Sequence, residues 1–296
     1  MPFRNTRPVS WLTFPPAMPR ALSRSLQIAG LAALLTGAPA SAAFAQTPPV
    51  PSAEAQIYER YRAWVTRQPP GGSPRELLDR YRQVLAGEGM APADVDRHLR
   101  VIGEQGRDLE IERWNRILTS EKPSFNVLPN QFLVDRTKGL KPGRALDVGM
   151  GQGRNALFLA QQGWEVTGFD PAGKAVAAAE AQAKALGVKL TTQVARDDQF
   201  EFGADRWDLI VLSYVSLRHL LPRVRQALAP GGFVIVEAFH RDATKAASIG
   251  GGVVFDSNEL LRLFDGFRVV HYEDADATAD FGKQMTRVVR LFAQKQ

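Results

Sequence analysis

The second half of the chain alternates short apolar runs with amphipathic segments. Apolar runs of strand length recur after Pro123, and segments of helix length separate the first five of them. This alternation predicts right-handed crossovers and a mainly parallel sheet with helices on both faces. The predicted strands are Ala145–Val148, Glu165–Phe169, Lys189–Val194, Leu209–Leu212, Phe233–Ala238, Phe267–Tyr272 and Thr286–Phe292, and the clearest helices are Asn155–Gln162, Ala172–Leu186 and Leu220–Leu228.

The last two predicted strands follow each other with no room for a helix between them. Parallel neighbours need a long crossover, whereas antiparallel strands need only a turn. We therefore expect a seven-stranded sheet that is parallel except at this end.

The region from Ala53 to about Thr119 has apolar residues at helical spacing and no strand-like alternation. Proline and glycine at 68–74 separate a first helix from a second. A third helix is expected from near Pro92 to Leu118, with Gly103 and Gly106 as candidate breaks. We therefore divide the chain into residues 1–45, a helical appendage at 46–122 that could cap a pocket, and an α/β domain at 123–296.

Residues 1–45 contain four arginines and no acidic residue, and their apolar stretch ends in Ala43-Phe44-Ala45. A basic start, a short apolar core and a small-residue site are typical of a secretory signal peptide. We expect cleavage after Ala45 and export to the periplasm or the extracellular space. The alternative is an unused signal and a cytoplasmic protein. Translation could begin at Met1 or at Met18, and the pattern does not decide between them.

The composition removes several classes of function. The chain has no cysteine, which excludes disulfides, zinc–thiolate and iron–sulfur sites and a cysteine nucleophile. The arginines of residues 1–45 account for most of the net charge of +6, and no basic cluster points to nucleic acid. No histidines and carboxylates have metal spacing. After signal cleavage no segment is apolar for long enough to span a membrane. The oligomeric state is left open.

The glycine stretch Gly149-Met150-Gly151-Gln152-Gly153 follows the first predicted strand of the α/β domain. A dinucleotide fingerprint is G-x-G-x-x-G, so the spacing differs. Asp147 lies inside the strand before the loop, where a carboxylate would repel a pyrophosphate but would suit a cationic ligand. Asp170 ends the next strand and is well placed for ribose hydroxyls. In open α/β sheets such a loop belongs at the ligand-binding edge.

These residues resemble the class I S-adenosylmethionine-dependent methyltransferases. ALDVGMGQG matches the first motif of that family, Asp170 its acid after the second strand, and LAPGG at 228–232 its turn before the fifth strand. Residues 128–170 look like the small-molecule subgroup related to tellurite-resistance methyltransferases. The resemblance implies a Rossmann-like methyltransferase fold over about residues 123–296 and S-adenosyl-L-methionine as cofactor.

The same resemblance implies a set of cofactor-binding residues. Asp147 would lie near the methionine end of the cofactor, Asp170 would take the ribose, and Asp197 or Asp198 the adenine amine. The complete set is Asp147, Gly149, Met150, Gly151, Gly153, Asn155, Asp170, Asp197, Asp198 and Ser213. The catalytic residues are not identified. Tyr214 and His240 are candidates, with Glu237 in the same location.

The resemblance favours methyl transfer to a small-molecule acceptor. The sequence offers no strong acid–base constellation, which favours a soft nucleophile such as a thiol or a chalcogen anion. One alternative is a binding module of the same fold without turnover, since an exported protein leaves the compartment in which the cofactor is made. A nicotinamide-dependent oxidoreductase is the other alternative, and the glycine spacing and Asp147 argue against it.

Overall fold

The computed structural model describes residues 52–68, 74–245, 249, 251–281 and 284–296. The predicted signal peptide at 1–45 and its cleavage site lie outside the described residues. In the described part of the chain, no helix has both the length and the apolar character needed to cross a bilayer.

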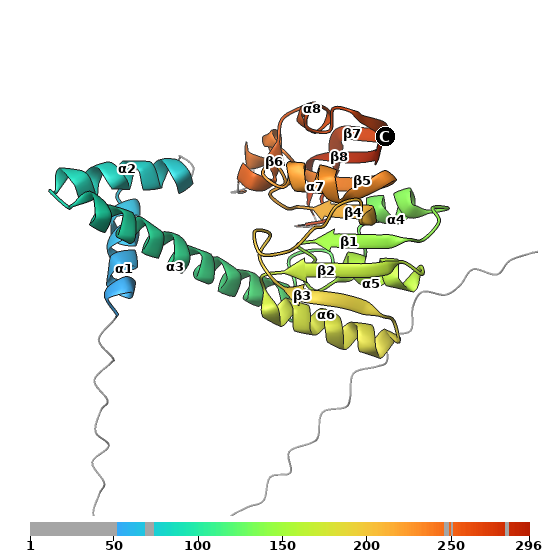
Figure 1. Ribbon diagram of the computed structural model, residues 1–296, viewed down its shortest axis with the longest axis horizontal. Helices are drawn as coiled ribbons and strands as arrows, with labels where there is room; N and C mark the ends of the chain where they lie inside the picture. Colours follow the sequence, from blue (N-terminus) through green and yellow to red (C-terminus); the bar gives the residue numbers. More distant parts are fainter. Residues whose placement is uncertain (1–51, 69–73, 246–248, 250, 282–283) are drawn as a thin grey trace, which may run out of the picture. The chain divides into compact units, whose positions relative to one another are not determined.

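Eight strands within the described residues form one sheet (Figure 1). They are β1 (Arg144–Val148), β2 (Glu165–Asp170), β3 (Leu190–Val194), β4 (Trp207–Ser213), β5 (Leu228–His240), β6 (Val254–Phe255), β7 (Phe267–Thr278) and β8 (Met285–Lys295). Seven follow the order β3-β2-β1-β4-β5-β8-β7, and β6 pairs in parallel with the end of β5. β8 runs antiparallel to both β5 and β7, so the expected mainly parallel sheet with an antiparallel end is confirmed.

The strand order reverses between β1 and β4, which are parallel neighbours. From β1 the chain passes through α5 (Arg154–Gln161) to β2 and through α6 (Gly173–Leu186) to β3, and then returns to β4 on the other side of β1. Such a reversal opens a crevice at the carboxyl ends of the strands. The glycine stretch leaves β1 at this point.

Both faces of the sheet are covered, and β1 and β4 accordingly carry consecutive buried residues rather than alternating ones. On one face, Leu146 and Ile210 pack with residues of α7 (Leu221–Ala227) and α8 (Glu259–Leu263). On the other face, Ala145 and Leu209 pack with residues of α4 (Gln131–Thr137) and α5. These two apolar clusters enclose the central strands from both faces.

The appendage consists of α1 (Ala53–Val65), α2 (Pro74–Gly87) and α3 (Pro92–Leu118), which share a small core around Tyr81 and Leu85. α3 is one continuous helix, so the candidate breaks at Gly103 and Gly106 are not used. A glycine inside a helix costs about 1 kcal/mol relative to alanine, and the buried residues Val101 and Ile102 on the same helix offset that cost.

Three short elements were not expected from the sequence. They are α4, α8 and the two-residue strand β6. Each is too short to show a clear apolar periodicity, and each forms where the sheet supplies packing partners.

Candidate functional site

Three glycines of the stretch after β1 have positive φ angles. Gly149, Gly151 and Gly153 have φ values of 64°, 57° and 78°, a region that side chains with a Cβ rarely adopt. Gly153 is the residue before α5, and a Cβ there would come within 2.8 Å of the Cβ of Ala179 on α6. Glycine at this position therefore serves both the turn and the packing of α5 against α6.

Asp170 holds this glycine stretch in place. Its carboxylate accepts the backbone N–H of Gly151 at 2.9 Å and that of Ala172 at 2.8 Å. The side chain is buried, and burial raises its pKa above the ordinary value. Each carboxylate oxygen retains a further lone pair, so the acid can fix the turn and still accept a hydrogen bond from a ligand.

The side chain of Met150 packs against β2 rather than toward the crevice. Its atoms occupy the space that a Cβ at Gly168 would need, and it belongs to an apolar cluster with Val176 and Ala179 of α6. The Met150 backbone N–H donates to the carbonyl of Phe169 at 3.0 Å. Met150 therefore forms the floor of the turn.

Asp147 is a buried acid on β1 with an unfilled hydrogen-bonding position. Only 2% of the residue is exposed, and Oδ2 has no hydrogen-bond partner. Burial, with a smaller contribution from Asp170, raises the pKa of Asp147 to about 7, while Arg154 and the backbone N–H of Ala156 act in the opposite direction. An unpaired buried carboxylate oxygen is costly without a ligand. This atom suits a cationic donor.

Arg154 and Asn155, the two residues after Gly153, connect the start of α5 to Asn130 and Asp280. These four residues are called the wall below. Arg154 forms an ion pair of 2.5 Å with Asp280, which lies between β7 and β8. The side-chain oxygen of Asn155 accepts the backbone N–H of Asn130 at 2.9 Å, and Asn130 donates its amide to Asp280 at 2.8 Å. The side-chain oxygen of Asn155 is thus bonded within the wall, and its cofactor-binding role stays a prediction.

The sequence did not reveal Asp280. Its carboxylate also accepts the side-chain amide of Asn126 at 2.8 Å, and its backbone N–H donates to the hydroxyl of Tyr214 at 3.1 Å. These partners are 154 and 66 residues away along the chain. No local pattern marks an acid whose partners all come from distant segments.

The two acids after β3 lie in different surroundings. Asp198 forms an exposed ion pair with its neighbour Arg196, which lowers the pKa of this aspartate. Asp197 contacts Nε2 of His219 at 2.6 Å, and His219 belongs to the loop after β4. Of the two, Asp197 is therefore the one linked to the loop after β4.

Ser213 ends β4 and lies beside Glu237 of β5 in the sheet register. The next residue, Tyr214, has a φ of 56°, which is unusual for a residue with a large side chain. Its hydroxyl donates to Glu237 Oε1 at 2.7 Å. Burial and the adjacent carboxylate of Glu237 raise the pKa of Tyr214 well above its ordinary value. The hydroxyl is therefore held in its protonated form.

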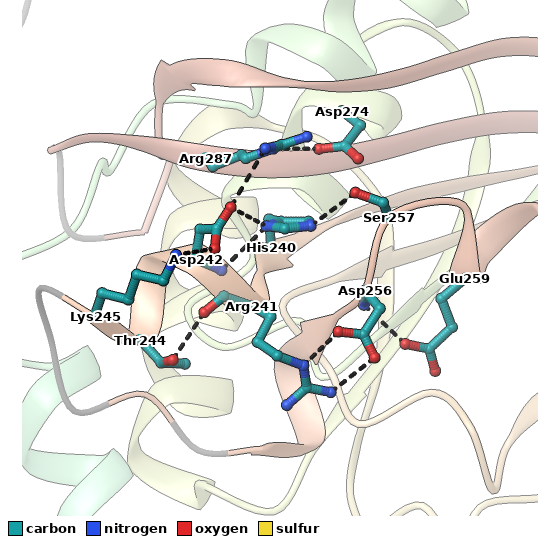
Figure 2. A network of polar contacts seen from close by, with 10 residues as sticks. All are labelled: His240, Arg241, Asp242, Thr244, Lys245, Asp256, Ser257, Glu259, Asp274 and Arg287. Atoms are coloured by element: carbon teal, nitrogen blue, oxygen red, sulfur yellow. Dashed lines mark hydrogen bonds and ion pairs between the residues drawn. The ribbon is translucent and has the colours of Figure 1, made fainter.

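His240 ends β5 and is engaged at both ring nitrogens (Figure 2). Nδ1 lies 3.0 Å from the backbone N of Asp242 and 3.3 Å from its Oδ2, and Nε2 contacts Ser257 Oγ at 3.1 Å. Asp242 is also bonded to Arg287, which pairs with Asp274. This network holds the imidazole in place and leaves neither ring nitrogen free.

The described histidines and carboxylates form no group that could hold a metal ion. The polar groups that do converge near the turn after β1 are Asp147, Asp170 and the backbone N–H groups of the glycine stretch.

Comparison with known proteins places this arrangement in a family. A family model described as "Tellurite resistance protein TehB" matches residues 125–287, more than half of the chain. The chain is 27% identical over 124 residues to a ubiquinone biosynthesis O-methyltransferase of Rhizobium leguminosarum, covering 40% of this chain and 48% of that protein. It is 23% identical over 153 residues to a probable S-adenosyl-L-methionine-dependent methyltransferase TehB of Haemophilus influenzae, covering 48% and 52%.

The chain spans about half the length of these curated relatives. A solved structure described as "Conversion of a Disulfide Bond into a Thioacetal Group during Echinomycin Biosynthesis" superposes with a TM-score of 0.51 at 18% identity, over 63% of this chain and 93% of that one. This similarity shows a shared fold.

Proposed function

This chain belongs to the family of the tellurite resistance protein TehB, and from that premise we propose that it is an S-adenosylmethionine-dependent methyltransferase acting on a small molecule. The observation that carries the proposal is Asp147 Oδ2, a buried carboxylate oxygen without a partner beside the glycine turn. A cationic cofactor relieves the cost of that oxygen, whereas a pyrophosphate would be repelled by it.

The described residues fit this cofactor. Asp147 would face its positively charged methionine end, Asp170 would accept hydrogen bonds from ribose hydroxyls, and Asp197 or Asp198 would accept from the adenine amine. When bound, S-adenosylmethionine supplies a methyl carbon already activated by a sulfonium sulfur. The work left to the protein is to align the acceptor and exclude water.

We further propose a soft acceptor such as a thiolate or a chalcogen anion. Among the described candidates for a general base, Tyr214 donates to Glu237, Glu237 is paired with Arg290 at 2.7 Å, and both nitrogens of His240 are bonded. An oxygen or amine acceptor would benefit from a base, whereas an acceptor that ionises by itself needs none.

The first experiment measures S-adenosylmethionine binding to the full chain by calorimetry, with the Asp147→Ala and Asp170→Ala variants beside it. We expect binding by the wild-type chain and loss of binding in both variants. NADH serves as the competing ligand. Tight NADH binding without S-adenosylmethionine binding would establish an oxidoreductase instead.

The second experiment offers thiols, selenite, tellurite, phenols and amines to the protein with the cofactor. We expect turnover with the soft nucleophiles, and activity confined to amines would overturn the acceptor proposal. Cofactor binding without turnover on any acceptor would favour the alternative of a binding module.

Export is a separate proposal, supported by the signal-like residues 1–45. N-terminal peptide mapping of the protein from the cell envelope tests it. A new N-terminus at Gln46 is expected, and an intact N-terminus in the cytoplasmic fraction would contradict it.

A further inference from the structure

The last turns of α3 reach the glycine turn after β1. A Cβ placed on Gly151 would lie 3.2 Å from Leu118 Cδ2, so the final residue of α3 packs directly on this glycine. The N–H of Gly151 is the one that Asp170 accepts. The end of α3 therefore packs on the residue whose N–H donates to the proposed ribose-binding acid.

A second contact joins α3 to the start of α6. The side chain of Asn115 is buried, and its Oδ1 accepts the backbone N–H of Lys174 at 2.9 Å. The residue before α6, Ala172, has no side chain that could cap the helix, so Asn115 supplies the cap from another element. The N–H of Ala172 donates to Asp170, and α3 thus contacts both segments that Asp170 holds.

A third contact fastens the same turns of α3 to the segment between β7 and β8. The ring of Trp114 meets that of Phe281 edge to face, with centroids 5.8 Å apart. Phe281 also stacks on Phe125 at 5.4 Å and contacts Tyr214 at 5.9 Å. Phe281 directly follows Asp280 of the wall. It therefore links the end of α3, through Trp114, to the loop after β4, through Tyr214.

These contacts come from outside the part of the chain that defines the family. The family model begins at residue 125, whereas α3 ends at Leu118. We propose that the last two turns of α3 form one side of the cofactor site, with Asn115 and Leu118 as positioning residues. This inference rests on the proposed function, because it names further residues of the same cofactor site.

The stability of α3 and the affinity for the cofactor are expected to be coupled. Leu118 restricts Gly151, and Asn115 fixes the segment that presents Ala172 to Asp170. A ligand that binds to this arrangement stabilises α3, and α3 in turn raises the affinity for the ligand by the same factor.

The test compares Asn115→Ala and Leu118→Ala with Arg116→Ala in the full chain. Arg116 is exposed on the same turn and serves as the matched control. Calorimetry with S-adenosylmethionine should show a dissociation constant raised about fivefold or more in the two variants, the usual size of such a coupling, and unchanged in the control.

Asn115→Asp distinguishes positioning from general loss of structure, because aspartate keeps an oxygen acceptor for the Lys174 N–H. We expect this variant to restore the affinity that Asn115→Ala loses. Hydrogen exchange of residues 112–118 should also slow when the cofactor is added to the wild-type chain.

Failure of this inference differs from failure of the proposed function. A wild-type chain that does not bind S-adenosylmethionine overturns both. Wild-type binding with equal affinity in Asn115→Ala and Leu118→Ala overturns the role of α3 alone. Equal loss in Asn115→Ala and Asn115→Asp also overturns positioning by this hydrogen bond.

Discussion

Arg154 and Asp280 form a buried ion pair at 2.5 Å, with 11% and 8% of their side chains exposed. The arginine opens α5 directly after the glycine stretch, and the aspartate lies between β7 and β8. Asn126 and Asn130 add two amide donors to the same carboxylate. Three segments that are distant in sequence are therefore joined at one acid beside the proposed cofactor site.

Replacing this acid should unfold the protein more easily than replacing an exposed one. We expect Asp280→Ala to lower the free energy of unfolding by about 3–5 kcal/mol, because it leaves the buried Arg154 unpaired. Asp135→Ala is the control, since its pair with Lys138 is exposed and worth about 0–1 kcal/mol. Urea unfolding measures both, and equal losses would show that the buried pair contributes nothing special.

Alanine substitution at two glycines with the same φ angle distinguishes the cost of backbone strain from the cost of steric crowding. Gly153 and Gly139 both have a φ of 78°, but a Cβ at Gly139 meets nothing within 4 Å, whereas one at Gly153 meets Ala179. Gly139→Ala should cost about 1–2 kcal/mol from the left-handed conformation alone. Gly153→Ala should cost about 1–3 kcal/mol more through overpacking. Thermal or urea unfolding checks the difference, and matching values would contradict the crowding.

The pH dependence of the free energy of unfolding should reveal the raised pKa of Asp147. Its native pKa is raised to about 7, so between the unfolded value and 7 the native state holds a proton that the unfolded state has lost. The free energy of unfolding therefore falls as pH rises through this window, by at most about 4 kcal/mol. Asp147→Asn lacks this contribution, and its stability relative to the wild-type protein should rise from pH 5 to pH 8.

Urea titrations of both proteins across that range supply the measurement. Parallel curves would mean that Asp147 ionises normally. With the cofactor bound, the wild-type protein should become more stable than Asp147→Asn at high pH, because the positive charge of the cofactor favours the ionised acid. We expect the wild-type affinity for S-adenosylmethionine to exceed that of Asp147→Asn most clearly above pH 7.

Tyr214→Phe tests whether the tyrosine hydroxyl positions the site or removes a proton. The hydroxyl bridges Glu237 and the N–H of Asp280, so its loss should cost about 1–3 kcal/mol of stability. Turnover on the best acceptor should stay within about tenfold, whereas removal of a general base costs about a hundredfold or more. Tyr272→Phe is the control, since that hydroxyl accepts the N–H of Asn258 in another part of the sheet. A hundredfold loss in Tyr214→Phe alone would make it catalytic.

The sheet could be predicted because its signals are local. Apolar runs such as those containing Leu146 and Ile210 mark buried strands, and the absence of space for a helix before Thr286 marks the antiparallel end. The short helices α4 and α8 could not be predicted, because a few residues carry too little periodicity. They form where the sheet provides an apolar surface.

The site could be predicted only where spacing along the chain determines position. Asp147 and Asp170 end or precede turns of fixed length, and both lie beside the glycine stretch as expected. Asp280 and Asn115 gain their partners through tertiary structure, from segments such as the one holding Asn126. The contacts of both His240 ring nitrogens likewise depend on Ser257 and Asp242, and no sequence pattern around the histidine predicts them.

β7 is an outer strand of the described sheet, with β8 on its inner side. A strand of twelve residues with an open side offers backbone groups to a strand of another molecule, and the exposed Val269 and Val270 would favour such pairing. Farther along β7, Glu273 is paired with Arg290 and Asp274 with Arg287, both on β8. These carboxylates are therefore used inside the sheet, and the part of the edge that favours pairing with another molecule is the stretch around Val269 and Val270.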